Sequence, residues 1–296
     1  MASFRRTKSR SFMVFIVLSV ILYYICVKGI FSTISSRRDD ITSNPTKVIV
    51  AASLKDDDTS WIRKELSDWE AKIYVVDSPE AKYTVPLNKG RESMVYLTYI
   101  IDHYDSLPDV IVFIHSQRYQ WHNDDPLYDN VPIIRSLRLP FVTKTGYAPL
   151  RCTWVPGCPS ELHPLNPTDE GRETRKLTER AYAAAFSELL PDIPVPEAVG
   201  APCSSQIAVS RETVWRRPKS SYERMQKWLI ETELSDKISG RVMEYTWHII
   251  MQMPTVYCPP AGQCYCMTFG LCDLKCTAAR WVEENTDGRS QDGTSE

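Results

Sequence analysis

The stretch from His115 to Asp125, HSQRYQWHNDD, holds a dense group of reactive side chains. Imidazoles titrate near neutral pH and carboxylates accept protons, so four of its residues are candidates for acid–base catalysis: His115, His122, Asp124 and Asp125. The same chemistry makes His115, Asp124 and Asp125 candidate ligands of a divalent metal such as Mn²⁺ or Mg²⁺. Three neighbours are suited to binding a substrate: Gln117, Arg118 and Trp121, whose indole can stack on a ring. The alternative is a long loop whose polar side chains bond one another.

Earlier in the chain, two acidic residues and a turn are further candidates for binding substrate. Asp57 and Asp58 follow an apolar run, where they can contact a cation or cap a helix. The turn NKGRES places Asn88, Arg91 and Glu92 where a loop enters a helix. Arg91 can hold a phosphate or carboxylate there, unless the segment is a surface turn in which Glu92 complements the helix dipole.

A pair of residues late in the chain completes the catalytic candidates. Glu244 and His248 are four positions apart, so on a helix they share one face. They can reach into a site together or form a local pair in solvent. The sequence contains no GxSxG, HExxH, P-loop or GxGxxG signature. Its net charge of −2 gives no indication of nucleic-acid binding.

The segments around the first candidates follow an α/β pattern. Short apolar runs rich in β-branched residues predict strands over 47–53, 71–77 and 109–116. Amphipathic segments predict helices within 56–69 and 91–108. This order predicts a mostly parallel sheet flanked by helices, in which ligands bind outside the carboxyl ends of the strands. His115 ends the third strand, so its surroundings are where a site is expected.

The second half of the chain is less regular and rich in cysteine. Helices are predicted within 127–139, 171–191, 221–234 and 239–253, and a strand over 205–210. Beyond the N-terminal segment there are eight cysteines, an even number that favours disulfides over a zinc site: Cys152, Cys158, Cys203, Cys258, Cys264, Cys266, Cys272 and Cys276. We therefore expect an α/β domain over 47–257, a cysteine-rich tail over 258–276 and a polar end over 277–296.

The N-terminal segment predicts a membrane anchor. Residues 12–31 are almost uncharged and close to the roughly 20 residues that a spanning helix needs. Basic residues before them place residues 1–11 in the cytoplasm, so that a stalk over 32–46 and the domain lie across the membrane. A cleaved signal peptide is the rival interpretation. The prediction is a single-pass type II membrane protein that faces the ER or Golgi lumen.

From Lys47 to about Cys272 the chain resembles a fungal family described as a domain of unknown function. The matching stretches are DDTSW, the segment from VPLNKGRES to HNDDPLYD, VPEAVGAPCSSQIAVSRE and CYCMTFGLC. The central segment also resembles glycosyltransferase-like proteins, which implies a GT-A-like, Rossmann-like nucleotide-sugar fold. In that fold an acidic D-x-D motif follows the apolar strand and holds a metal. Here that place reads His115-Ser116-Gln117, so the motif that binds the metal and the sugar nucleotide in that fold is absent.

These observations favour a membrane-anchored, glycosyltransferase-like transferase that acts on a glycan or small-molecule acceptor. Asp124 or Asp125 would be its base, and Arg91 and Arg118 would hold a sugar-nucleotide donor. The resemblance also implies an alternative, a secondary-metabolite enzyme such as an aminoacyl-tRNA-dependent synthase of arginine-containing cyclodipeptides, in which acidic residues bind the arginine side chain: Asp57, Asp58, Asp124 and Asp125. A non-catalytic lumenal binding protein is the third hypothesis.

Overall fold

The computed structural model describes residues 28, 45–169 and 171–274. Apart from Lys28, the predicted anchor over 12–31 lies outside these residues, as do most of the stalk and the polar end. Within the described part of the chain no helix is long and apolar enough to cross a bilayer. The described residues from Thr46 to Leu274 form one unit.

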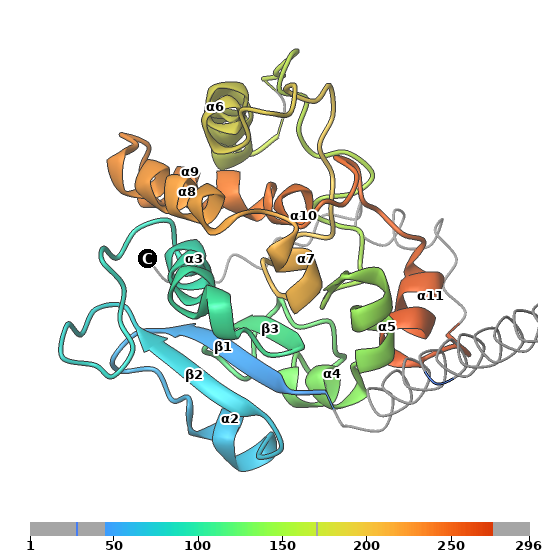
Figure 1. Ribbon diagram of the computed structural model, residues 1–296. Coiled ribbons are helices and arrows are strands. Elements are labelled where there is room, and N and C mark those ends of the chain that lie inside the picture. Colours follow the sequence, from blue (N-terminus) through green and yellow to red (C-terminus); the bar gives the residue numbers. More distant parts are fainter. Residues whose placement is uncertain (1–27, 29–44, 170, 275–296) are drawn as a thin grey trace, which may run out of the picture. The chain divides into compact units, whose positions relative to one another are not determined.

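A five-stranded sheet with the order β2-β1-β3-β5-β4 forms the centre of this unit (Figure 1). β1 pairs in parallel with β2 and β3, whereas β5 pairs antiparallel with β3 and β4. The α/β class is therefore as predicted, but the expectation of a mostly parallel sheet needs correction, because two of these four pairings are antiparallel. The strands are β1 (Lys47–Ser53), β2 (Glu70–Val75), β3 (Val110–His115), β4 (Tyr147–Pro149) and β5 (Ile207–Ser210).

Both faces of the central strands are buried. Along β3, Ile111 and Phe113 belong to one apolar core, and Val110, Val112 and Ile114 belong to the other. Successive side chains of a strand point to opposite faces, so a strand covered on both faces needs an unbroken apolar run. This explains why the sequence VIVFI shows no alternation.

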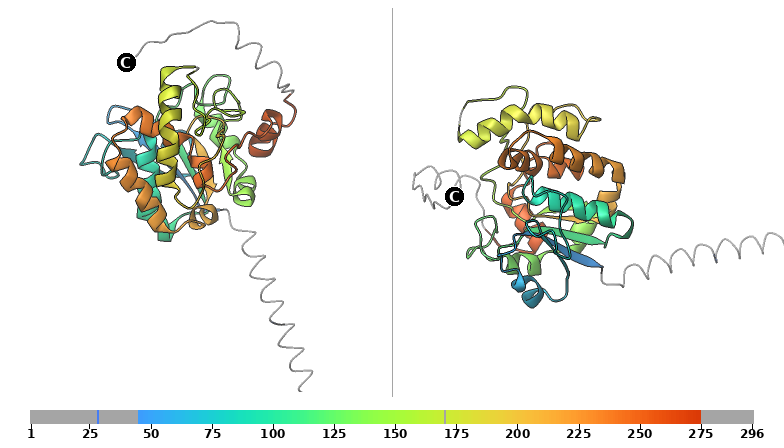
Figure 2. Two further views of the ribbon diagram at one scale, coloured as in Figure 1. Left: turned by 90° about the horizontal axis from the view of Figure 1, so that it is seen from above. Right: turned by 90° about the vertical axis from the view of Figure 1, so that its left-hand side faces the viewer.

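Helices cover the two faces of the sheet unequally. On one face α3 packs on β1, α8 and α9 pack on α3, and α6 packs on α8 and α9; Figure 1 and the right-hand view of Figure 2 show these layers. Shorter helices cover the other face. The bounds of the stacked helices are α3 (Glu92–His103), α6 (Glu173–Leu189), α8 (Lys219–Glu231) and α9 (Asp236–Glu244). Those of the opposite face are α2 (Ser60–Glu65), α4 (Asn130–Ser136) and α5 (Leu139–Thr145).

The remaining elements are short, and several depart from the sequence prediction. The helix expected over 239–253 is two helices, because α9 ends at Glu244 and α10 (Trp247–Ile250) follows a turn. The helix α5 and the strand β4 lie in a region in which neither a helix nor a strand was expected. The other elements are α7 (Arg211–Trp215), α11 (Ala261–Cys264), η1 (Tyr104–Ser106) and η2 (Tyr265–Phe269).

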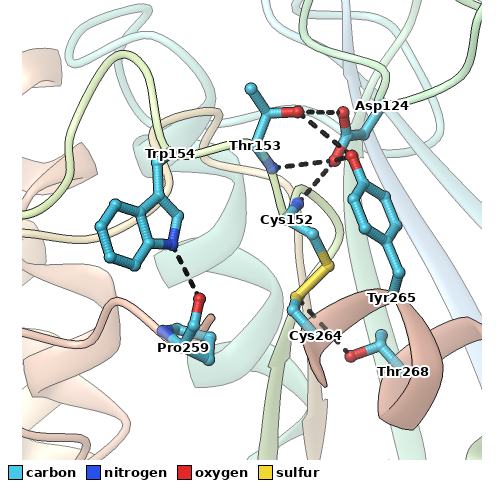
Figure 3. Close-up of a disulfide and its surroundings, with 8 residues drawn as sticks. All are labelled: Asp124, Cys152, Thr153, Trp154, Pro259, Cys264, Tyr265 and Thr268. Atoms are coloured by element: carbon cyan, nitrogen blue, oxygen red, sulfur yellow. Dashed lines mark hydrogen bonds between the residues drawn. A yellow bond between two sulfur atoms is a disulfide. The ribbon is translucent and has the colours of Figure 1, made fainter. Parts of the chain in front are cut away.

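Three disulfides confirm the prediction for six of the eight cysteines. They join Cys152 to Cys264, Cys158 to Cys258 and Cys266 to Cys272, and the first appears in Figure 3. The first two tie the tail to the loops after β4 across 112 and 100 positions. Cys203 was wrongly included, because it is a buried free thiol. Cys276 lies outside the described residues.

Candidate functional site

The topological switch point of the sheet lies between the carboxyl ends of β1 and β3. The chain leaves β1 for β2 on one side and returns to β3 on the other, which is the arrangement where open α/β sheets bind ligands. Asp57 Oδ2 accepts hydrogen bonds from Ser116 Oγ at 2.6 Å and from the Leu54 amide at 2.8 Å. Asp57 therefore links the two strand ends. Asp58 accepts from the Ser60 amide at 2.9 Å, but it does not cap α2, whose N-cap residue is Thr59.

Two histidines share one glutamine at the end of β3. Nδ1 of His115 and Nδ1 of His122 lie 3.1 and 3.0 Å from Gln120 Oε1. Because an amide oxygen only accepts, we infer that both rings carry their proton on Nδ1. Nε2 of His115 then has a free lone pair. Burial, followed by the charges of His115 and nearby arginines, lowers the pKa of His122 to about 3 and keeps it neutral.

Glu92 faces that free nitrogen from the start of α3. Its Oε2 lies 4.0 Å from His115 Nε2, and the two side chains are only 13% and 19% exposed. Within the described residues the Glu92 carboxylate accepts no hydrogen bond, and His115 Nε2 also has no hydrogen-bond partner. Tyr96, one turn further along α3, is fully buried, and its hydroxyl is unpartnered as well. Buried polar atoms normally have hydrogen-bond partners, so we infer that Glu92, His115 and Tyr96 bind a ligand or a proton.

Tight packing fixes the position of Glu92. Gly90 has a φ of +72°, and a Cβ there would come within 2.4 Å of Leu229. Arg91 donates its amide to Asp236 Oδ1 at 3.1 Å, and its side chain lies against Gly240. Arg91 was expected to bind an anion, but here it fastens the start of α3 to α9.

Glu244, the last residue of α9, is a second carboxylate of the same cluster. Cys203 Sγ donates to its Oε1 at 2.7 Å, and Arg241 Nη1 donates to its Oε2 at 3.0 Å. Burial raises the pKa of Glu244; the charge of Arg241 opposes this rise and that of Glu92 adds to it. Burial, then the charge of Glu244, raises the pKa of Cys203, so its thiol keeps the proton that it donates. We call Glu92, Tyr96, His115, His122 and Glu244 the acid–base cluster.

The acidic residues of the loop after β3 have other partners. Asp124 accepts from the amides of Cys152 and Thr153, from Thr153 Oγ1 and from Tyr265 Oη, all within 3.1 Å (Figure 3). Asp125 accepts from the amides of Leu127 and Asp129. These bonds shape the loop, and the catalytic roles of both aspartates remain predictions without geometric support.

Other expected site residues form hydrogen bonds elsewhere in the protein or lie at the surface. Arg118 donates two hydrogen bonds to Asp129, at 3.0 and 2.8 Å. His248 is buried and bonds the carbonyl of Thr255, and its burial lowers its pKa to about 4. It does not share a face with Glu244, because α9 ends between them. Asn88 and Gln117 are exposed.

The expected metal ligands do not come together. No group of three or more His, Cys, Asp or Glu side chains in the described chain is placed to hold a metal ion. Asp124 and Asp125 are bonded within the loop, so they do not join His115 as a ligand set.

A pocket of about 580 Å³ adjoins the acid–base cluster. Trp121 and Arg241 line the pocket and contact the cluster: the Trp121 ring centroid is 3.9 Å from that of His122, and Arg241 donates to Glu244. We call it the basic pocket, and its lining residues are Trp121, Pro156, Glu161, Gly171, Arg172, Thr174, Arg175, Thr178, Lys237, Arg241 and Tyr245. Sequence reasoning missed all of these except Trp121. The only signal was the basic run GRETRK, which also suits a solvated helix start.

Comparisons with known proteins identify a family whose description names no activity. Neither the curated proteins nor the solved structures contain a match to this chain. A family model matches residues 49–267, which include the whole acid–base cluster and the basic pocket. The chain therefore belongs to the family described as "Protein of unknown function (DUF3431)".

Proposed function

We propose that this protein is a glycosyltransferase-like transferase that moves a group from a sugar-nucleotide donor to a hydroxyl of a glycan or small-molecule acceptor. The observation that carries the proposal is that Glu92 and His115 face each other at the end of β3 while neither the Glu92 carboxylate nor His115 Nε2 forms a hydrogen bond within the described residues. A base with an open lone pair and an adjacent negative charge is what removal of a hydroxyl proton requires.

In the proposed reaction His115 is the base. The acceptor hydroxyl donates to Nε2 of His115, and its oxygen attacks the sugar carbon of the donor. The bond from that carbon to the phosphate oxygen breaks, its electron pair stays with the phosphate, and the hydroxyl proton passes to Nε2. Glu92 then stabilises the positive imidazolium, while Gln120 holds Nδ1 and the ring orientation.

A lumenal location completes the proposal. The anchor predicted over 12–31 would place the domain across the membrane, and three disulfides fit an oxidising compartment. Protease treatment of sealed microsomes tests this directly. We expect the domain to survive until detergent is added, and digestion without detergent would overturn the lumenal location.

One observation favours a second candidate, the amide-forming synthase of arginine-containing products. The carboxylate of Glu92, free of hydrogen bonds within the described chain and close to Glu244, could bind a guanidinium group. This reaction uses cytosolic aminoacyl-tRNA, so the protease result separates the two candidates.

Turnover by full-length protein in detergent micelles tests the transferase. We expect release of nucleotide from one member of a sugar-nucleotide panel in the presence of a mixed glycan acceptor. His115→Gln and Glu92→Gln should each lower the rate by about 10²–10⁴-fold. Glu223→Gln, which changes an exposed carboxylate on α8, is the matched control and should leave the rate unchanged. Full activity in both cluster variants would remove the proposed base, and donor binding without any turnover would favour a binding protein.

A further inference from the structure

The basic pocket has a charge that its own ion pairs do not cancel. Four of its lining residues are basic, and Glu161 is the acidic one. Arg175 is engaged, because it lies 3.7 Å from Glu161 Oε1 and donates to the buried Glu179. The side chains of Arg172 and Lys237 form no ion pair or hydrogen bond within the described residues. An excess of positive charge in a concave site favours an anion.

Arg241 connects this charge to the acid–base cluster. Its Nη1 donates to Glu244 Oε2 at 3.0 Å, and the side chain also lines the pocket. A guanidinium has five N–H donors, so one bond to Glu244 leaves donors for a ligand. An anion in the pocket would therefore lie within reach of the group that also holds Glu244.

Aromatic side chains give the same pocket a surface for a ring. The Trp121 side chain is 47% exposed although it packs on His122, and the buried Tyr245 forms another part of the lining. The volume of about 580 Å³ is within the range of about 300–1,000 Å³ that small-molecule sites occupy. Exposed indole beside cationic side chains suits a ligand that joins a ring to an anion.

We propose that the basic pocket binds a ring that carries a phosphate or carboxylate, with the anion held by Arg172, Lys237 and Arg241 and the ring against Trp121. The proposal rests on the transferase function only in naming this ligand as one of its substrates. The anion has two sources, the diphosphate of the donor or an acidic group of the acceptor. The expected anion-binding residues each face a carboxylate already: Arg118 donates two hydrogen bonds to Asp129, and the Arg91 Nε lies 3.9 Å from Asp236 Oδ2.

Calorimetric titration of full-length protein in detergent micelles tests the proposal with three probes: uridine diphosphate, glucuronate and uridine. We expect saturable binding of at least one anion, weaker binding at high salt, and much weaker binding of uridine. Binding of uridine diphosphate assigns the anion to the donor, whereas binding of glucuronate alone assigns it to the acceptor. If neither anion binds at millimolar concentration, or if uridine binds as tightly as its diphosphate, the proposal is overturned.

Single substitutions locate the site. Arg172→Gln and Lys237→Met should each weaken binding of the anion about tenfold, as loss of a charge-assisted bond does. Both side chains are exposed, so folding should be unaffected, which thermal unfolding checks. Lys227→Met is the matched control, because Lys227 is exposed on α8 and pairs with Glu231 outside this pocket. Equal weakening in the control, or none in the pocket variants, contradicts the assignment.

A further variant separates this inference from the transferase function. His115→Gln should abolish turnover and leave anion binding intact. If the wild-type protein binds the anion but shows no turnover with any donor, the pocket assignment stands and the transferase function fails. If turnover occurs while Arg172→Gln and Lys237→Met bind the anion normally, the transferase function stands and the pocket assignment fails.

Discussion

The loop after β3 and the facing ends of α3 and α9 both carry carboxylates, but these have different surroundings. In the loop, Asp124 accepts four hydrogen bonds and Asp125 accepts two. At the helix ends, Glu92 accepts none within the described residues, and Glu244 has a raised pKa that burial causes. An acidic residue that accepts several backbone hydrogen bonds stabilises a conformation. A nearly buried carboxylate that accepts none is available for a proton or a ligand. The number of donors therefore separates Asp124 from Glu92, whereas Glu244 accepts two hydrogen bonds, as Asp125 does, and is distinguished by its burial.

The largest expected effect concerns the disulfide that anchors the loop region. Cys152→Ala combined with Cys264→Ala should lower the free energy of unfolding by about 4 kcal/mol. Because the nested bridge between Cys158 and Cys258 stays closed, about 3 kcal/mol comes from the roughly 12 remaining loop positions, and the rest comes from lost packing of two buried sulfurs. The control pair, Cys266→Ala with Cys272→Ala, opens a loop of six positions and should cost about 2 kcal/mol. Urea denaturation measures both. Equal losses would show that loop length does not govern these bridges.

The next largest effect compares one carboxylate from each of the two regions. Asp124→Ala should lower the free energy of unfolding by about 3 kcal/mol, because four donors lose their acceptor. Glu92→Gln should change it by no more than about 0.5 kcal/mol, because no donor depends on Glu92. The same denaturation experiment compares them. Similar losses of unfolding free energy for the two variants would show that hydrogen-bond donors do not distinguish Asp124 from Glu92.

A smaller effect should appear as a pH dependence of stability. The pKa of His122 falls from 6.5 to about 3 on folding. Between these values the unfolded chain binds a proton that the folded chain does not, so stability is complete above the unfolded pKa and is lost as the pH falls. We expect His122→Gln to reduce the loss between pH values of about 7.5 and 5.5 by up to about 1 kcal/mol. An unchanged slope in the variant would show that His122 titrates normally.

The smallest effect concerns the thiol that donates to Glu244. Cys203→Ala removes this donor, so the pKa of Glu244 should rise further, while Cys203→Ser supplies a hydroxyl donor in its place. The expected cost of the alanine variant is about 1 kcal/mol or less. The pH profile of turnover should move upward in Cys203→Ala and return in Cys203→Ser. Identical profiles in both variants would exclude a role for the thiol in positioning Glu244.

The parts of the fold that depend on local pattern could be predicted from the sequence. Unbroken apolar runs predicted β1 and β3, and helical spacing predicted α3, because these patterns report burial directly. β4 was missed because it is three residues long and ends in Pro149, which gives no pattern. The separation of Glu244 from His248 was also missed, since the turn between α9 and α10 depends on tertiary packing.

The candidate site could be predicted only in part. His115 and Glu92 could be named, because one ends a strand and the other begins a helix at the expected edge. The sequence could not show that Asp124 is held by Thr153 and Tyr265, which are distant in the chain. The basic pocket combines Trp121, Arg172 and Arg241, and only the folded chain brings such separated residues together.

The two long disulfides have a consequence for the order of biosynthesis. Cys152 and Cys158 leave the ribosome 112 and 100 residues before their partners. All five strands, which end at Ser210, are synthesised while these two thiols still await Cys264 and Cys258. The nascent sheet must therefore persist by its backbone hydrogen bonds and apolar packing before either bridge forms. A premature bond between Cys152, Cys158 or the later Cys203 is the error that a thiol-exchange chaperone would have to correct.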